Sequence, residues 1–229
     1  MEIAPSWLQV WMVPGCQPLI WFCLKYQKLH LVYDYMPHDS LSKHLFVTAG
    51  SPTILSWDCR SKIITGAAQG LHHFHIHGCV TSSNILIESD FTACLGDFGS
   101  SDLVKMSSEM DVFFFGVVVI EVVSGHRSSG DDLPMVLGNG FKFLVDWVWA
   151  LHEKGCILDA LDANLGIISS YNGCQNRNMV EAKKILLIGL ARSHPDPKKR
   201  LKIETVVDIL KSNSMPPPQV PQPKPNHGG

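Results

Sequence analysis

Two side chains with oxygen ligands flank a pair of short apolar runs near the middle of this 229-residue chain. Asn84 stands directly before Ile85–Ile87, and Asp97 follows a second run at residues 92–95. Ser89 and Asp90 lie between the runs and are typical turn residues, so the pattern predicts a β-hairpin that brings Asn84 and Asp97 together. An amide oxygen and a carboxylate are hard ligands suited to Mg²⁺ that carries phosphates.

A second group of candidate ligands alternates along the chain just before this hairpin: His73, His75, His77 and Cys79. On a strand these side chains would share one face and could bind zinc. The alternative is that they span the end of a helix and the loop after it, where this spacing points them apart. We favour the second interpretation, because the preceding residues carry the apolar period of a helix.

Composition limits the classes of function. The chain is 45% hydrophobic and 17% charged with a net charge of −2, so we expect a packed core and no partnership with nucleic acid. Seven cysteines without a Cys-x-x-Cys pair indicate reduced thiols rather than a disulfide framework. The N-terminus lacks the basic start of a secretory signal. The longest apolar run, residues 112–123, is interrupted by Gly116 and Glu121 and is too short for a transmembrane segment.

The regular elements that must position the candidate site can be placed from periodicity. Residues 29–36 predict a strand that Pro37 ends, and Ser56 is a plausible N-cap for a helix that runs to about Phe74. An apolar helix is expected from Asp111 to Gly125, although its many β-branched residues also suit a strand. Further helices are expected at 144–151, 180–192 and 203–210, and a Pro-rich tail at 214–229.

The central stretch resembles the catalytic core of the eukaryotic protein kinases. Asp97-Phe98-Gly99 is similar to the magnesium-binding Asp-Phe-Gly motif, and residues 77–84 have the length of the catalytic loop His-Arg-Asp-x-x-x-x-Asn. His77 and Asn84 match that loop. Gly78 stands in place of the Arg, Cys79 in place of the catalytic Asp, and Thr81 in place of the usual Lys. The resemblance therefore implies a metal site at Asn84 and Asp97 without the group that accepts the proton.

A second string, Leu31-Val-Tyr-Asp-Tyr-Met-Pro37, is similar to the kinase hinge. By that resemblance Tyr33 is the gatekeeper, the backbone of Asp34 and Met36 meets adenine, and Leu86 forms the floor under the base. We call residues 33–37 the hinge segment.

Other kinase features are altered or absent. By the resemblance, Asp111 orients the backbone of the catalytic loop. Only residues 100–110 separate Gly99 from Asp111, and no Ala-Pro-Glu occurs, so Arg200 is expected to lack the Glu with which it normally pairs. No Gly-rich loop and no strand-3 Lys precede the hinge segment. ATP and Mg²⁺ are therefore expected to bind weakly or not at all.

Finer details resemble plant receptor-like Ser/Thr kinases of the legume-lectin-domain type. They include the hinge string, residues 144–148 (Leu-Val-Asp-Trp-Val), residues 193–197 (Ser-His-Pro-Asp-Pro) and the Met-Pro-Pro-Pro tail. The resemblance implies an α+β, protein-kinase-like fold, mainly the helical large lobe with a truncated small lobe. The expected divisions are residues 1–36 for the small-lobe remnant, 37–213 for the large lobe and 214–229 for a disordered tail.

Three functional hypotheses remain open at the sequence level. The first is a catalytically inactive pseudokinase that acts by binding proteins, among them active receptor-like kinases. The second is a weakly active ATP-dependent Ser/Thr protein kinase, and the third is a non-functional truncated gene product. The expected location is the cytoplasm, at the inner face of the plasma membrane where partners hold it there.

Overall fold

The computed structural model describes residues 17, 19–25, 28–46, 55–73, 77–78, 80–96, 108–128, 143–165, 177–212 and 215–220. Their regular elements, in chain order, are β1 (Leu19–Lys25), β2 (Lys28–Tyr33), α1 (Leu41–Leu45), α2 (Trp57–His73), β3 (Ile85–Ile87), β4 (Ala93–Leu95), α3 (Ser108–Ser124), α5 (Leu144–Glu153), η3 (Ile157–Ala160), η4 (Ala163–Leu165), α6 (Arg177–Arg192), η5 (Pro197–Lys199) and α7 (Ile203–Lys211).

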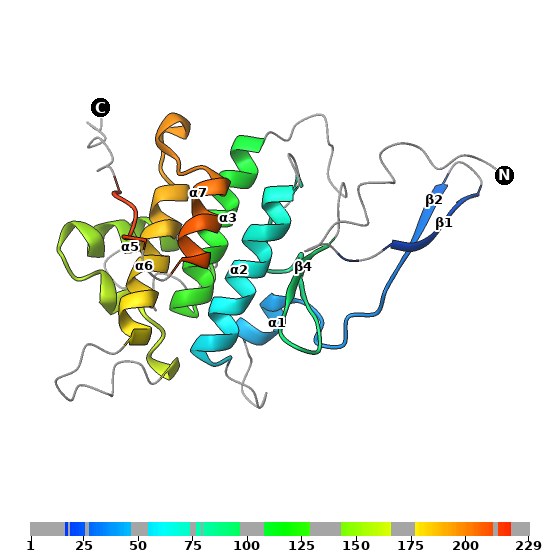
Figure 1. Ribbon diagram of the computed structural model, residues 1–229, viewed down its shortest axis with the longest axis horizontal. Helices are drawn as coiled ribbons and strands as arrows, with labels where there is room; N and C mark the ends of the chain where they lie inside the picture. Colours follow the sequence, from blue (N-terminus) through cyan, green and yellow to red (C-terminus); the bar gives the residue numbers. More distant parts are fainter. Residues whose placement is uncertain are drawn as a thin grey trace.

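Helix α3 is the centre of the helical body, where it lies beside α6 (Figure 1). Its residues from Phe115 to Ser124 are all buried, as expected for a helix that is apolar on every side. Gly116 on α3 allows the two backbones to approach closely, because a Cβ there would lie 2.7 Å from the carbonyl oxygen of Gly189 on α6. The helical interpretation of this run is confirmed, and the strand alternative is wrong.

Helix α2 packs against α7 and β4 and begins as its sequence predicts. The Ser56 hydroxyl accepts the backbone N–H of Cys59 at 3.3 Å, which caps the first turn. Ile63, Ala67 and Leu71 form the predicted apolar stripe and are at most 4% exposed. The last residue of the expected stripe, Phe74, lies outside the described residues.

The hairpin of β3 and β4 is confirmed, with Ile85 opposite Leu95 and Ile87 opposite Ala93. Its connection contains Phe91 at a φ of 64°, the left-handed conformation that a tight turn requires. An isolated bridge joins Leu86 to Ser40, just ahead of α1, so the hairpin is attached to the segment that follows the hinge.

The strand predicted at 29–36 is β2, which ends at Tyr33 rather than at Met36. Its partner β1 begins at Leu19, opposite Tyr33, so residues 34–36 have no strand beside them. The Asp34 carboxylate also accepts the N–H of Tyr35 at 2.9 Å, a local bond in place of a strand partner.

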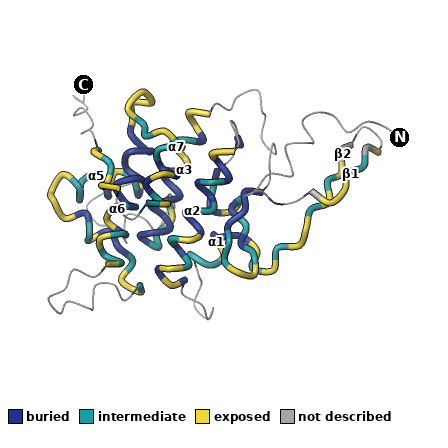
Figure 2. Tube along the Cα trace, viewed as in Figure 1, coloured by how far each residue is buried: buried dark blue, intermediate teal, exposed yellow. Residues whose placement is uncertain are grey.

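Strand β1 was not predicted, although the apolar run at residues 19–24 is a signal for it. Figure 1 shows β1 and β2 at one end of the molecule, joined to α1 by residues 34–40. Buried residues are concentrated in the helices, whereas Ile20 and Trp21 of β1 are 63% and 59% exposed (Figure 2).

The observed architecture is the expected α+β arrangement: a mainly helical body with two small antiparallel sheets. In the parts of the chain that the structure describes, no helix combines the length and the apolar character needed to cross a bilayer.

Candidate functional site

The start of the catalytic loop is held by one buried carboxylate. Asp111, in the first turn of α3, is 3% exposed and accepts the backbone N–H groups of His77 at 2.7 Å and Gly78 at 3.0 Å. Bonds from N–H groups to a charged acceptor are stronger than neutral ones, and the N-terminus of a helix favours negative charge. The predicted role of Asp111 in orienting this loop is confirmed.

The two ends of the β3–β4 hairpin are joined to this loop. The Gly96 N–H donates to the Asn84 carbonyl at 2.8 Å, and the His77 ring nitrogen Nε2 lies 3.0 Å from the Gly96 carbonyl. Asn84 is therefore fixed beside the residue that precedes Asp97. Asp97 itself lies outside the described residues, so the Mg²⁺ pair stays a prediction.

The loop departs from the kinase pattern at Gly78, Cys79 and Thr81, and the structure describes the first and the third of these residues. Gly78 has a φ of 88°, a backbone conformation in which glycine is unstrained. Thr81 is partly buried, and its carbonyl accepts the Asn84 N–H at 3.0 Å in a tight turn. Cys79, at the position of the catalytic Asp, lies outside the described residues.

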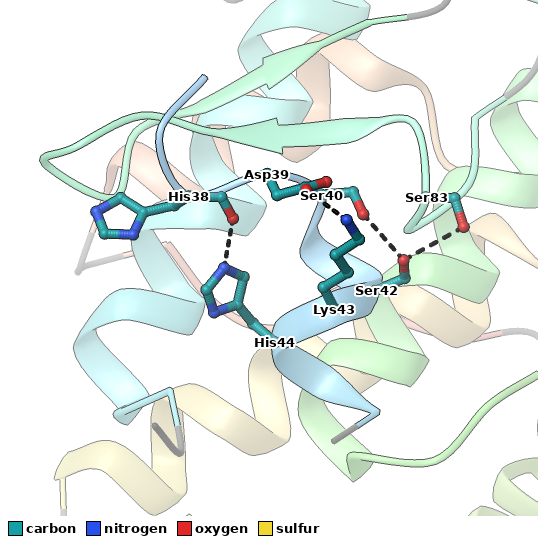
Figure 3. A network of polar contacts seen from close by, with 7 residues as sticks. All are labelled: His38, Asp39, Ser40, Ser42, Lys43, His44 and Ser83. Atoms are coloured by element: carbon teal, nitrogen blue, oxygen red, sulfur yellow. Dashed lines mark hydrogen bonds and ion pairs between the residues drawn. The ribbon is translucent and has the colours of Figure 1, made fainter. Parts of the chain in front are cut away.

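A polar network ties the segment after the hinge to the same loop (Figure 3). Ser83 donates to the Ser42 hydroxyl at 3.4 Å, and Ser42 in turn contacts the Ser40 hydroxyl at 3.1 Å. Asp39 binds Lys43 and the Ser40 N–H, and these contacts lower the pKa of Asp39. The hinge side of the site is thus connected to the catalytic-loop side through side chains on α1.

The hinge segment itself carries an unexpected contact. Gln17 donates its side-chain amide, from Nε2, to the Asp34 carbonyl at 3.0 Å. This carbonyl is one of the two hinge groups at which adenine is expected. The Met36 carbonyl accepts the Asp39 N–H at 3.2 Å. The carbonyls of Asp34 and Met36 thus both accept hydrogen bonds from within the chain.

The remaining predicted adenine groups lie near this contact. Leu86, the expected floor, is partly exposed on β3, and Tyr33 closes β2 opposite Leu19. Gln17 was not identified from the sequence. The only signal for it is its place two residues before the apolar run of β1, which says nothing about the hinge.

Arg200, which in the kinase family pairs with a Glu, donates to two backbone carbonyls in this structure. Its Nε donates to the His194 carbonyl at 2.8 Å, and its Nη1 donates to the Glu109 carbonyl at 2.8 Å. The guanidinium also lies over the Phe113 ring, 5.1 Å from its centroid. Arg200 therefore connects the turn after α6 to the first turn of α3.

The zinc alternative receives no support from the part of the chain that the structure describes. Within that part, no three His, Cys, Asp or Glu side chains lie close enough together to hold a metal ion. His73 ends α2, as the favoured interpretation predicts, and two members of the proposed set, His75 and Cys79, are not described.

Comparison with known proteins agrees with this geometry. A sequence model of the family described as protein tyrosine and serine/threonine kinase matches residues 14–110, which include the hinge segment, the catalytic loop and Asp97. The probable L-type lectin-domain containing receptor kinase S.5 of Arabidopsis thaliana is 33% identical, over 90% of this chain and 36% of its own length. The L-type lectin-domain containing receptor kinase IV.2 of the same plant is 34% identical, over 86% of this chain and 32% of its own.

A third relative, the lectin-domain containing receptor kinase VI.3 of Arabidopsis thaliana, is 35% identical over 82% of this chain and 30% of its own length. The chain thus spans about a third of the length of these relatives. Residues 14–110 thus match the protein kinase family, and the chain is homologous, over most of its length, to L-type lectin-domain containing receptor kinases of plants.

Proposed function

We propose that this chain is a pseudokinase: it keeps the kinase fold, does not transfer phosphate and acts by binding proteins. The observation that carries the proposal is the contrast within the catalytic loop. Asp111 holds the loop backbone in place through His77 and Gly78, yet Cys79 occupies the position of the catalytic Asp. The scaffold of the site is kept where its acid–base group is lost.

The size of this loss supports inactivity. A positioned acid or base contributes about 10²–10⁴-fold to a rate, and Cys79 has no carboxylate with which to accept the substrate proton. Thr81 replaces the cationic side chain that would face the transferred phosphate, and phosphoryl transfer depends mainly on positioning and electrostatic stabilisation. Both changes act on the transition state, so their effects combine.

The surroundings of the site support the same conclusion. The segment between Gly99 and Asp111 is short and lacks Ala-Pro-Glu, the end of the region that docks peptide substrates in the family. Arg200 is engaged by backbone carbonyls instead. The Asp34 carbonyl is engaged by Gln17, which weakens any adenine binding at the hinge segment.

Protein binding is supported by an apolar pocket of about 420 Å³ between α3 and α5. Phe113, Phe114 and Val117 of α3 line it together with Phe143 and Trp149. Phe114 and Phe143 are 36% and 56% exposed at this pocket, and contiguous exposed apolar surface is typical of protein-binding sites. Active receptor-like kinases are the partner class that the family relationship suggests.

A phosphotransfer assay tests the catalytic half of the proposal. Wild type and the Cys79→Asp/Thr81→Lys double variant are incubated with Mg²⁺·ATP and a general protein substrate, with an active receptor-like kinase domain as the positive control. We expect both proteins to remain at background. Activity in wild type that Asp97→Asn abolishes would favour the weakly active kinase and overturn the pseudokinase proposal.

A thermal melt and a binding titration test the other half. A cooperative melt is expected; its absence would favour a gene product that does not fold alone. Binding to a purified receptor-like kinase domain should be weakened by Phe143→Ser, beside the apolar pocket. Tyr35→Ser, at an 83% exposed residue after β2, is the matched control and should leave binding unchanged.

A further inference from the structure

Gln17 connects three parts of the nucleotide site that are distant in the sequence. Its backbone N–H donates to the carbonyl of Leu95, the last residue of β4, at 3.0 Å. Its side-chain Nε2 donates to the carbonyl of Asp34 in the hinge segment, also at 3.0 Å. The backbone bond fixes where the side chain starts, so the second bond is made by a residue that is already held in place.

The other end of the same carboxamide faces the floor of the site. A Cβ placed on Gly96 would lie 3.3 Å from Gln17 Oε1 and 2.7 Å from Leu86 Cδ1. Gly96 is buried and has no side chain, so Gln17 and Leu86 share the space above its Cα. The carboxamide therefore lies between the hinge carbonyl and Leu86, where the kinase resemblance places the edge of the purine.

We propose that Gln17 sets the base specificity of this site by replacing the 6-amino group of adenine. Its amide nitrogen supplies the hydrogen bond that this amino group would donate to the Asp34 carbonyl. While Gln17 stays in place, a 6-amino group on the purine gains no hydrogen bond to the Asp34 carbonyl. Adenine nucleotides therefore bind no more tightly than purine nucleotides without that group. This inference rests on the proposed function in one respect, namely that the chain keeps the kinase fold, and it takes from the kinase resemblance that a nucleotide would bind at the hinge segment.

The expected effect follows from the value of one neutral hydrogen bond. Such a bond contributes roughly 0.5–1.5 kcal/mol net, which corresponds to about 2–10-fold in affinity. Removing the carboxamide frees the Asp34 carbonyl, so the affinity for ligands that carry the 6-amino group should rise by this factor. Purines without that group should not respond.

The test compares two nucleotides that differ only at position 6: ADP, and purine riboside diphosphate, which lacks the amino group. Dissociation constants are measured by calorimetry in Mg²⁺ for wild type, Gln17→Ala and Gln69→Ala. Gln69 lies on α2, beside a different pocket, and provides a matched control. We expect wild type and Gln69→Ala to bind both nucleotides within about twofold of each other, and Gln17→Ala to prefer ADP by about 2–10-fold.

Two results would overturn the inference while leaving nucleotide binding at the hinge segment intact. One is a wild type that already prefers ADP by more than about tenfold, which needs no variant to observe. The other is a Gln17→Ala protein that melts like wild type and shows an unchanged ratio. If neither nucleotide binds wild type or Gln17→Ala at millimolar concentration while both proteins melt cooperatively, the hinge assignment fails and the inference fails with it.

Discussion

The carboxylate of Asp111 accepts two bonds from the Gly78 backbone N–H, with both oxygens 3.0 Å from the nitrogen, and its Oδ2 also accepts the His77 N–H at 2.7 Å. This side chain thus joins the first turn of α3 to the loop that follows α2. The bonds connect residues 33 and 34 positions apart in the sequence. They fix the start of the catalytic loop relative to the most buried helix.

Removing this connection should destabilise the protein. Asp111→Ala leaves two buried N–H groups without their acceptor, so we expect the free energy of unfolding to fall by about 2–4 kcal/mol in urea titrations. Asp111→Asn keeps one side-chain oxygen as an acceptor, so it should lower the free energy of unfolding by less than Asp111→Ala. Asp58→Ala removes an exposed carboxylate from the first turn of α2 and should cost about 1 kcal/mol or less. If Asp111→Ala and Asp58→Ala lowered the free energy of unfolding equally, Asp111 would act only as a charge at the helix terminus.

The contact between α3 and α6 gives a second prediction. Ala normally stabilises a helix by about 1 kcal/mol relative to Gly. At Gly116 the added Cβ would instead lie 2.7 Å from both the Gly189 carbonyl oxygen and the Ser193 nitrogen. We expect Gly116→Ala to lower the free energy of unfolding by about 1–3 kcal/mol, because backbone atoms must move apart.

Met110→Ala on the same helix is the comparison for this variant. Met110 is 39% exposed, so its truncation should change the free energy of unfolding by about 0.5 kcal/mol or less. A Gly116→Ala protein as stable as wild type would show that the two helices can separate without cost.

Arg192 provides a prediction in the stabilising direction. Its side chain is 0% exposed and donates from Nη1 to the Leu201 carbonyl at 2.7 Å, while Nε and Nη2 have no hydrogen-bond partner among the described residues. Donors that are buried without acceptors are costly, so Arg192→Met should raise the free energy of unfolding by roughly 1–3 kcal/mol. Arg177→Met, at an exposed position of α6, should have little effect. A destabilised Arg192→Met protein would show that the guanidinium contributes more than it costs.

The advantage of Arg192→Met should depend on pH. Burial lowers the pKa of Arg192 to about 9 in the folded protein, well below the ordinary arginine value that the unfolded chain keeps. Between these values the unfolded state binds more protons, so this group makes wild type more stable as pH rises above about 9. The stability difference between Arg192→Met and wild type should therefore be constant below about pH 9 and shrink above it, as measured by urea titrations at several pH values. If the stability difference between Arg192→Met and wild type grew with pH, the lowered pKa of Arg192 in the folded protein would be contradicted.

Several elements were predictable because their signals are local. The stripe of Ile63, Ala67 and Leu71 predicted α2, and Ser56 marked its start. The turn residues Ser89 and Asp90 predicted the hairpin of β3 and β4. The position of Asp111 at the start of an apolar run, together with the kinase resemblance, predicted its role. In each case the relevant residues lie in one segment or in a motif with a fixed order.

Other features depend on contacts between distant segments, and periodicity carries no information about them. The end of β2 at Tyr33 is set by where its partner β1 begins. The substitute acceptors of Arg200 are carbonyls that no side-chain pattern reveals. The burial of Arg192 also follows from the packing of α6 against α3 and from its bond to the Leu201 carbonyl.

The sequence by itself determined the kinase resemblance, the order of the helices and which residues stand at positions 78, 79 and 81, because residue identity and local spacing suffice for these. Only the tertiary structure decided which backbone N–H groups Asp111 accepts, those of His77 and Gly78, and that Gln17 donates to the carbonyl of Asp34 in the hinge segment. The physical reason is that a hydrogen bond depends on the distance between two atoms in space. The pairing of Leu19 on β1 with Tyr33 on β2 places residues 17 and 34 within that distance.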